Sequence, residues 1–187
     1  MFREREPDDR DADLVIGRLL LGKGESAGLE HLERATTAFW SGLPACEIAY
    51  DYLMRTNERE AAHEWRLKGE AFMDQHELAH AERSKITRND DYFLPNTTDQ
   101  ENEDITRQLR EIPEITHAWI AQKRVEIGPE IPLIVVIFKS KGFGKAEEIG
   151  GYLIENLVLP GHGYILAWAG DDKKLAKQIS QLALQLF

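Results

Sequence analysis

A run of six apolar residues at positions 133–138 constrains the fold of this chain more than any other feature. The run is Leu, Ile, Val, Val, Ile and Phe, so an extended segment there is apolar on both faces. Such a strand has to be covered on both faces, which is typical of a central strand in a layered α/β unit. Pro132 precedes the run, where a proline is compatible with the start of a strand. We therefore expect residues 133–138 to form the middle of a small sheet with helices packed against it.

The other C-terminal segments supply the remaining strands and helices of this unit. Further strands are expected over 115–125 and 163–169, and helices over 103–111, 145–157 and 172–186. The order helix, strand, strand, helix, strand, helix predicts a small three-stranded α/β domain over residues 103–187. The fold class of the whole chain is therefore predicted to be α+β.

The N-terminal part shows helical periodicity only. We expect a helix from Asp11 or Asp13 to Gly22, a second over 26–39, a third with Pro44 at its first position, and a fourth from about Glu58 toward Lys85. A turn at Thr56 and Asn57 separates the last two helices.

These helices resemble two copies of one helix-turn-helix unit. Gly17 and Ala49 take equivalent places at an offset of 32 residues, close to the 34 of a tetratricopeptide repeat. We expect antiparallel, tetratricopeptide-like hairpins over 11–88, capped by the second half because two repeats rarely bury a continuous core alone. The charged residues 1–10 are expected to be disordered, and the turn-rich stretch 89–102 to be a linker.

The charge of the chain excludes some function classes. The 187 residues include 33 acidic and 23 basic side chains, which give a net charge of −10. Residues 1–104 account for −11 and residues 105–187 for +1, so the acidity belongs to the helical part. This balance argues against nucleic acid as a partner. The single cysteine, Cys46, excludes a disulfide framework.

Nothing in the sequence favours direct insertion into a membrane. The N-terminus is charged where a secretory signal needs an apolar stretch. The longest apolar run, 131–138, is far short of the roughly 20 residues that span a bilayer. We therefore expect a cytoplasmic protein or the soluble part of a membrane-associated one.

The strongest local motif is an H-E-x-x-H formed by His76, Glu77 and His80. On a helix, positions i and i+4 share a face, so both imidazoles can bind one zinc ion. Glu77 could then serve as general base toward a metal-bound water. A working site also needs a third ligand, for which Glu101 or Glu103 has suitable spacing.

The surroundings of the motif favour the plainer interpretation. The flanking residues are polar and charged, as on the exposed end of a helix, and Glu101 and Glu103 lie in or beside the predicted linker. A solvated helix face is therefore preferred, with no catalytic residue, no metal ligand and no cofactor. A zinc peptidase using His76 and His80 as ligands and Glu77 as base stays the alternative.

Other candidate sites are weaker. Lys141 and Lys145 flank a glycine-rich turn before a helix, but without the spacing of a phosphate-binding loop. His117 and His162 are interpreted as structural, and Cys46 as a small core side chain. The helical part also carries aromatic residues that either line a peptide-binding groove or, preferably, form the core: Trp40, Tyr50, Tyr52, Trp65 and Phe72.

Five segments together resemble a known family. They are residues 14–20, 45–50, 81–83, 88–95 and 118–123, in this order along the chain. The chain resembles the C-terminal region of bacterial membrane metallopeptidase-like proteins of the HtpX and CAAX-prenyl-protease type. In that family a membrane-embedded peptidase domain comes first, and a tetratricopeptide-like stretch and a small α/β domain follow. The resemblance covers about residues 11–187, although Asn96 and Thr97 stand where many relatives have His-Gly.

The resemblance bears directly on the histidine motif. The family's zinc-binding motif belongs to the upstream peptidase domain, which these residues do not include, so no catalytic residue carries over. It implies that the chain is a non-catalytic accessory module, alone or as part of a longer protein. The implied partner is a protein or peptide, with a membrane peptidase domain as one possibility.

Overall fold

The computed structural model describes residues 9–129, 131–142 and 144–187. The described chain divides into two compact units. The first takes its residues up to His80 together with Ile127–Pro129, and the second takes Ala81–Glu126 and the residues that follow the 127–129 segment. Within the described residues there are seven α-helices and a five-stranded mixed sheet, so the predicted α+β class is correct. The expected disorder of residues 1–10 falls mostly on residues outside the described part.

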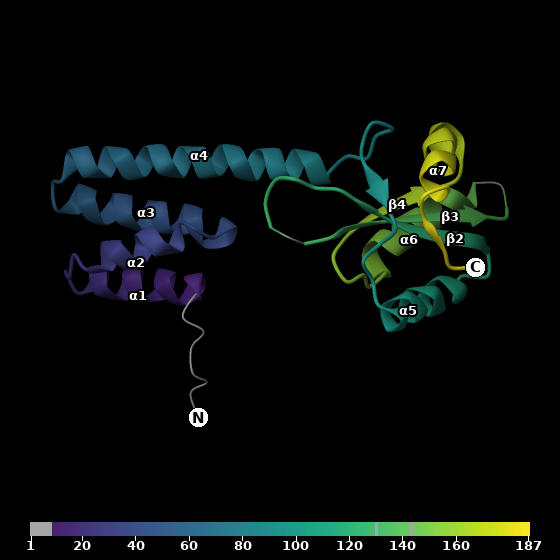
Figure 1. Cartoon of the computed structure of the whole chain (residues 1–187), viewed down its shortest axis with the longest axis horizontal. Coiled ribbons are helices and arrows are strands. Elements are labelled where there is room, and N and C mark those ends of the chain that lie inside the picture. The colour runs from purple at the N-terminus through teal and green to yellow at the C-terminus, as the bar shows by residue number, and fades with distance from the viewer. Residues whose placement is uncertain (1–8, 130, 143) are drawn as a thin grey trace, which may run out of the picture. The chain divides into compact units, whose positions relative to one another are not determined.

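The first unit consists of four helices, α1 (Arg10–Gly22), α2 (Gly28–Ala35), α3 (Phe39–Arg55) and α4 (Arg59–Arg83) (Figure 1). Asp9 caps α1 by accepting a hydrogen bond from the Ala12 N–H at 3.0 Å. Asn57 has a positive φ of 64° in the predicted turn between α3 and α4. The buried core residues range in sequence from Leu21 to Trp65 and include Leu32 and Leu53.

Helices α1 and α2 approach each other through two glycines. A Cβ atom built on Gly28 would lie 2.6 Å from the Gly17 carbonyl oxygen, and one on Gly17 would lie 2.9 Å from the Gly28 carbonyl oxygen. Carbon atoms in contact normally need about 3.5–4.0 Å. A side chain at either position therefore requires the two helix backbones to separate.

The expected boundary between the second and third helices was wrong. Helix α3 begins at Phe39, and Pro44 lies inside it and not at its first position. Proline removes one helical hydrogen bond, that to the Trp40 carbonyl. Tertiary contacts hold the turns before it, because the buried Ser41 hydroxyl donates to the Ala35 carbonyl at 3.0 Å and Gly42 lies against the Phe72 ring.

The second unit is a sheet covered by helices on both faces. The strands are β1 (Tyr92–Phe93), β2 (Ile115–Lys123), β3 (Leu133–Ser140), β4 (His162–Ala167) and β5 (Leu184–Gln185). The order is β1-β2-β3-β4, and β5 pairs with β2; β3 and β4 are parallel and the other pairs antiparallel.

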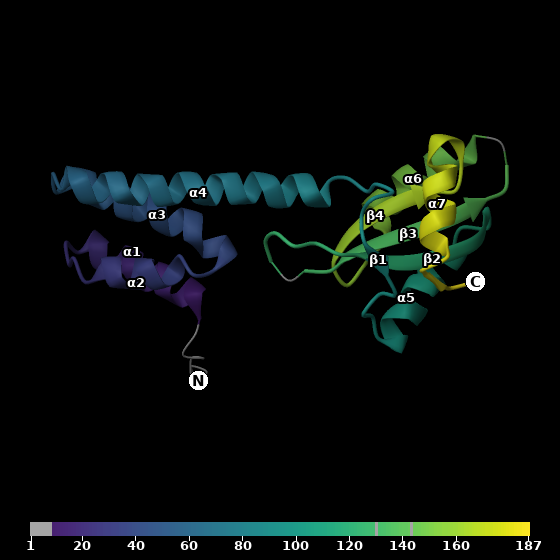
Figure 2. The same ribbon diagram turned by 45° about the horizontal axis from the view of Figure 1, so that its top comes forward.

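One face of the sheet packs against α5 (Asp99–Arg110) and α6 (Lys145–Asn156) and the other against α7 (Lys173–Ser180). Figures 1 and 2 show α5 and α7 on opposite sides of the strands. A 3-10 turn, Gly170–Asp172, precedes α7. As the apolar run predicts, residues 133–138 of β3 are buried on both faces.

The expectation of three strands was wrong, because two short strands were not predicted. β1 lies in the segment expected to be a linker, and β5 lies where α7 was expected to continue to residue 186. Both pair with β2, which supplies backbone partners that the local sequence does not reveal. Helix α5 also begins four residues earlier than expected, because Thr98 and Glu101 form a capping box.

A buried lysine holds the end of α4 within the second unit. Lys123 is 4% exposed, and its ammonium donates to the carbonyl oxygens of Glu82 and Lys85, both at 2.7 Å. The same ammonium lies 3.1 Å from the Asp90 carboxylate. Asp90 also accepts hydrogen bonds from the Thr87 N–H and the Tyr92 hydroxyl. The buried charge is therefore paired and hydrogen-bonded, as its burial requires.

Candidate functional site

The H-E-x-x-H residues lie on α4, in the first unit, as the sequence predicts. His76 is half-buried, and its ring stacks on Phe39 with centroids 4.1 Å apart. Its Nε2 lies 3.0 Å from the Phe39 carbonyl oxygen, which can only accept, so Nε2 carries the proton. His76 is thus tied to the start of α3, and the prediction of a fully solvated helix face does not hold for it.

Among the described residues, the other motif residues make no such contacts. Glu77 and His80 are both exposed. Glu101, one of the two candidates for a third zinc ligand, accepts hydrogen bonds from the Thr98 N–H and hydroxyl in the capping box of α5. In the part of the chain that the structure describes, no three or more His, Cys, Asp or Glu side chains lie close enough to share a metal ion.

The rings of Phe39, Trp40 and His76 contact one another and are partly or largely exposed. Together with the exposed Met73 we call them the Trp40 surface. Trp40 is 58% exposed, and its ring meets Phe39 edge-on at 4.9 Å and His76 at 5.9 Å. Met73, one turn before His76 on α4, is also exposed. An indole held by two neighbouring rings yet largely in water is characteristic of interface anchors.

The remaining aromatic residues of the helical part belong to its core. Tyr52 and Trp65 are buried, and Tyr50 and Phe72 are partly buried against the same cluster. These four residues therefore belong to the core and do not line a peptide-binding groove. Of the five aromatic residues considered in the sequence, only Trp40 is largely exposed. The sequence did not distinguish it, because the third helix was expected to begin at Pro44 and Trp40 therefore fell in the turn before that helix.

The Trp40 surface lies in an acidic unit. Residues 9–80 carry fourteen Asp and Glu against eight Lys and Arg. On α4 itself, Asp74 and Glu77 flank His76 within two positions and are exposed. A partner for this surface is therefore expected to present basic residues around an apolar pocket.

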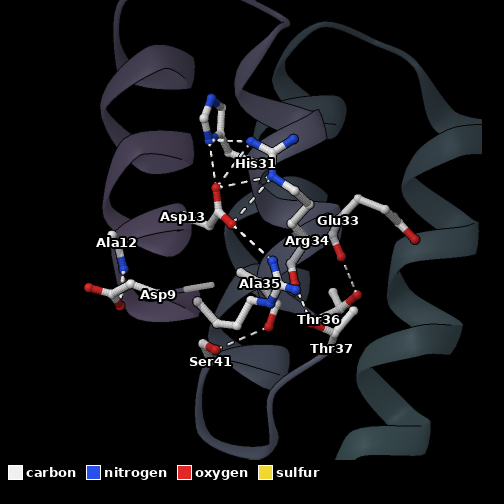
Figure 3. A network of polar contacts seen from close by, with 11 residues as sticks. Asp9, Ala12, Asp13, His31, Glu33, Arg34, Ala35, Thr36, Thr37 and Ser41 are labelled. Atoms are coloured by element: carbon white, nitrogen blue, oxygen red, sulfur yellow. Dashed lines mark hydrogen bonds and ion pairs between the residues drawn. The ribbon is translucent and has the colours of Figure 1, made fainter. Parts of the chain in front are cut away.

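An Asp–His–Arg network connects α1 to α2 on another part of the first unit (Figure 3). The Asp13 carboxylate lies 2.8 Å from Nδ1 of His31 and accepts hydrogen bonds from the Arg34 guanidinium at 3.1–3.3 Å. Burial acts to raise the pKa of Asp13, but the hydrogen bonds from Arg34 and His31 outweigh it and hold the pKa below its ordinary value. The network stabilises the ionised carboxylate and links α1 to α2, so we interpret it as structural.

The weaker candidates occupy structural positions. Cys46 is 1% exposed, and burial raises the pKa of its thiol to about 11, so it is an unreactive core side chain. Gly142 and Gly144 have positive φ angles in the turn before α6, as a strand-to-helix turn requires. His117 is exposed and stacks on Trp119 at 5.8 Å, and His162 begins β4.

Comparisons with protein-family models, with curated proteins and with solved structures returned no match. In addition, no described helix combines the length and the apolar character needed to cross a bilayer.

Proposed function

We propose that this chain is a non-catalytic interaction module that binds a protein or peptide partner. The observation that carries the proposal is the Trp40 surface, where a tryptophan is 58% exposed although two aromatic rings hold it in place. Burying an exposed tryptophan removes a large apolar area from water with little loss of side-chain freedom, because neighbouring rings already restrict it.

The surroundings narrow the chemistry of the partner. An anchoring indole fits a concave apolar pocket, and the carboxylates of Asp74 and Glu77 favour lysine or arginine at the rim of that pocket. We therefore propose a basic partner segment with an apolar pocket or an apolar side-chain cluster.

The family resemblance suggests one particular partner class. We propose that a metallopeptidase-like membrane domain is a partner, with this chain holding or positioning a substrate beside it, either as a part of a longer protein or as a free-standing relative. The tetratricopeptide-like character of the helical unit belongs to the same proposal. The close approach of Gly17 to Gly28 supports it, because a small residue between paired helices is a feature of such repeats.

The test is a peptide selection followed by a matched pair of variants. A displayed random peptide library is selected on the full-length protein, and the enriched peptides are measured by calorimetry against the wild type, Trp40→Ala and Tyr152→Ala. Tyr152 is a comparable control, since it is an aromatic residue with 55% exposure in the other unit.

We expect enriched peptides to be basic and to lose at least tenfold in affinity with Trp40→Ala but not with Tyr152→Ala. A tryptophan hot spot is worth about 2 kcal/mol or more, which supports this threshold. Equal binding to all three proteins, or enrichment of acidic peptides, would refute the proposal.

A further inference from the structure

A groove runs between helix α5 and the short strand β5 in the second unit. It is largely open to solvent and has a volume of about 790 Å³, within the range of about 300–1,000 Å³ common for ligand sites. One wall is a single face of α5 that includes Glu103, Arg107 and Arg110, and the other wall is formed by Leu184, Gln185 and Leu186. The opposite face of α5, with Ile105 and Leu109, is buried in the core, so the groove face is the polar side of this helix.

The strand that forms one wall has a backbone edge available for pairing. Among the described strands β5 pairs with β2 only, with Gln185 opposite Trp119 and Leu184 opposite Ile120. The Leu186 N–H donates to the Ala118 carbonyl at 2.9 Å. Because an antiparallel ladder alternates, Leu184 and Leu186 bond to β2, and the N–H and C=O of Gln185 are directed away from it. An extended peptide can accept and donate at that position.

The charges of the groove are arranged in two groups along α5. Asp99 and Glu103 lie in the N-terminal half of the helix, Arg107 and Arg110 lie in the C-terminal half, and Glu111 follows directly after the helix. Arg107 is paired with Asp104 at 2.6 Å. The Arg110 guanidinium lies 5.0 Å from the Phe187 ring, and within the described residues it has no carboxylate partner. A bound carboxylate would supply the bidentate acceptor that a guanidinium favours.

We propose that this groove binds an extended peptide that pairs with the β5 edge and places an acidic side chain on Arg110. A basic side chain of the same peptide then meets Glu103. Residues 103 and 110 are seven positions apart, or about 10 Å along the helix axis. In an extended peptide, side chains four positions apart share a face and lie about 13 Å apart, a difference that the long side chains of Arg110 and of a peptide lysine can bridge. This groove and the Trp40 surface belong to different units and share no residues. A negative result for one proposal therefore does not contradict the other.

The test uses a labelled peptide of nine residues in which valine and threonine alternate, with one lysine and one glutamate four positions apart so that both side chains share a face. Binding to the full-length protein is followed by fluorescence anisotropy. We expect saturable binding that weakens at least tenfold with Arg110→Glu and is unchanged with Lys141→Glu, an exposed cation of the same unit. A peptide with lysine in place of its glutamate should regain binding to Arg110→Glu.

A second peptide separates strand pairing from charge attraction. The same sequence with N-methylated backbone amides keeps its charges but cannot donate to the Gln185 carbonyl, and it should bind at least tenfold more weakly. Equal binding of the methylated peptide would overturn strand pairing, and equal binding to the wild type and Arg110→Glu would overturn the acidic contact. Self-association of the chain without peptide binding, detected by sedimentation, would assign the edge to a second copy and also overturn the proposal.

Discussion

The close approach of α1 and α2 gives a sharp prediction for Gly28→Ala. The added methyl carbon would lie 2.6 Å from the Gly17 carbonyl oxygen and 2.7 Å from Cγ of Leu21. An ordinary contact needs about 3.5 Å, so one backbone must move by about 0.9 Å relative to the other. The oxygen belongs to the main chain, and a side-chain rotation cannot relieve the contact.

The expected cost follows from packing and helix propensity. Overpacking of this kind costs about 1–3 kcal/mol. Alanine recovers part of this, up to about 1 kcal/mol in a helix interior, and less at Gly28 because it is the first residue of α2. We therefore expect a net loss of about 1–2 kcal/mol in the free energy of unfolding, or about 4–16 °C in the Tm of a unit of this size.

The matched control is Gly22→Ala at the end of α1, where an added Cβ meets no atom within 4 Å. It should be neutral or stabilise by up to about 1 kcal/mol. Unfolding in urea is followed by circular dichroism and by the NMR signal of the Trp65 indole, which reports on the core of the first unit. Equal stability of Gly28→Ala and wild type, or an equal loss in both variants, would show that the glycine contact does not set the helix spacing.

Three further predictions follow from other contacts. Lys123→Met removes a buried ammonium from two carbonyl oxygens and a carboxylate and should cost about 3–5 kcal/mol in urea unfolding; a loss below 1 kcal/mol would contradict this role. The pKa of Asp13 is lowered from its ordinary value of 3.8, so its ionised form stabilises the native state above about pH 4. The stability difference between wild type and Asp13→Asn should therefore shrink as the pH falls below 4, and a difference that stays constant down to pH 2 would refute it. His76→Ala should cost about 1–2 kcal/mol because His76 donates a hydrogen bond and stacks on a ring, whereas His80→Ala should stay within about 0.5 kcal/mol; an equivalent of zinc in the wild type, lost equally in both variants, would instead support the peptidase alternative.

The elements that follow from the sequence are those with a sustained pattern of apolar residues. Residues 133–138 give a strand because every side chain is apolar, and α4 and α6 are found within two residues of their expected bounds. The two helices are long enough for their periodicity to identify them without knowledge of their partners. The strand is identified instead by a short apolar run that follows Pro132 and is rich in β-branched residues.

The missed elements depend on partners that are distant in the sequence. In β1, Tyr92 pairs with Lys123, and in β5, Gln185 pairs with Trp119, so tertiary contacts define both strands. Leu182 and Leu186 have the spacing of a helix and extended the expected α7, yet Leu182 is exposed and Leu186 packs in the core after a turn. Leu184 and Leu186 are two positions apart, which is the spacing of side chains on one face of a strand. The sequence is therefore equally compatible with a strand at this place, as the structure has it.

The candidate site was predicted less well than the fold. The motif identified His76 and His80, but the ring contact of His76 with Phe39 depends on the packing of α4 against the start of α3. That packing could not be inferred while α3 was expected to begin at Pro44, since Phe39 and Trp40 were then assigned to the end of another helix and the turn after it. An error of five residues in one helix start therefore concealed the aromatic surface.

The pairing of β5 with β2 has a consequence for synthesis on the ribosome. The core of the first unit lies between Leu21 and Trp65, so it can form while the rest of the chain is still being made. The sheet of the second unit needs residues 184–185 beside residues 119–120. At about 5–20 residues per second, the roughly 120 residues between Trp65 and the end of β5 take about 6–24 s to appear. β2 is complete at Lys123, so for roughly the last 62 of these residues, or about 3–12 s, the part of its edge that pairs with β5 is uncovered. A chaperone that binds extended apolar segments could bind β2 there.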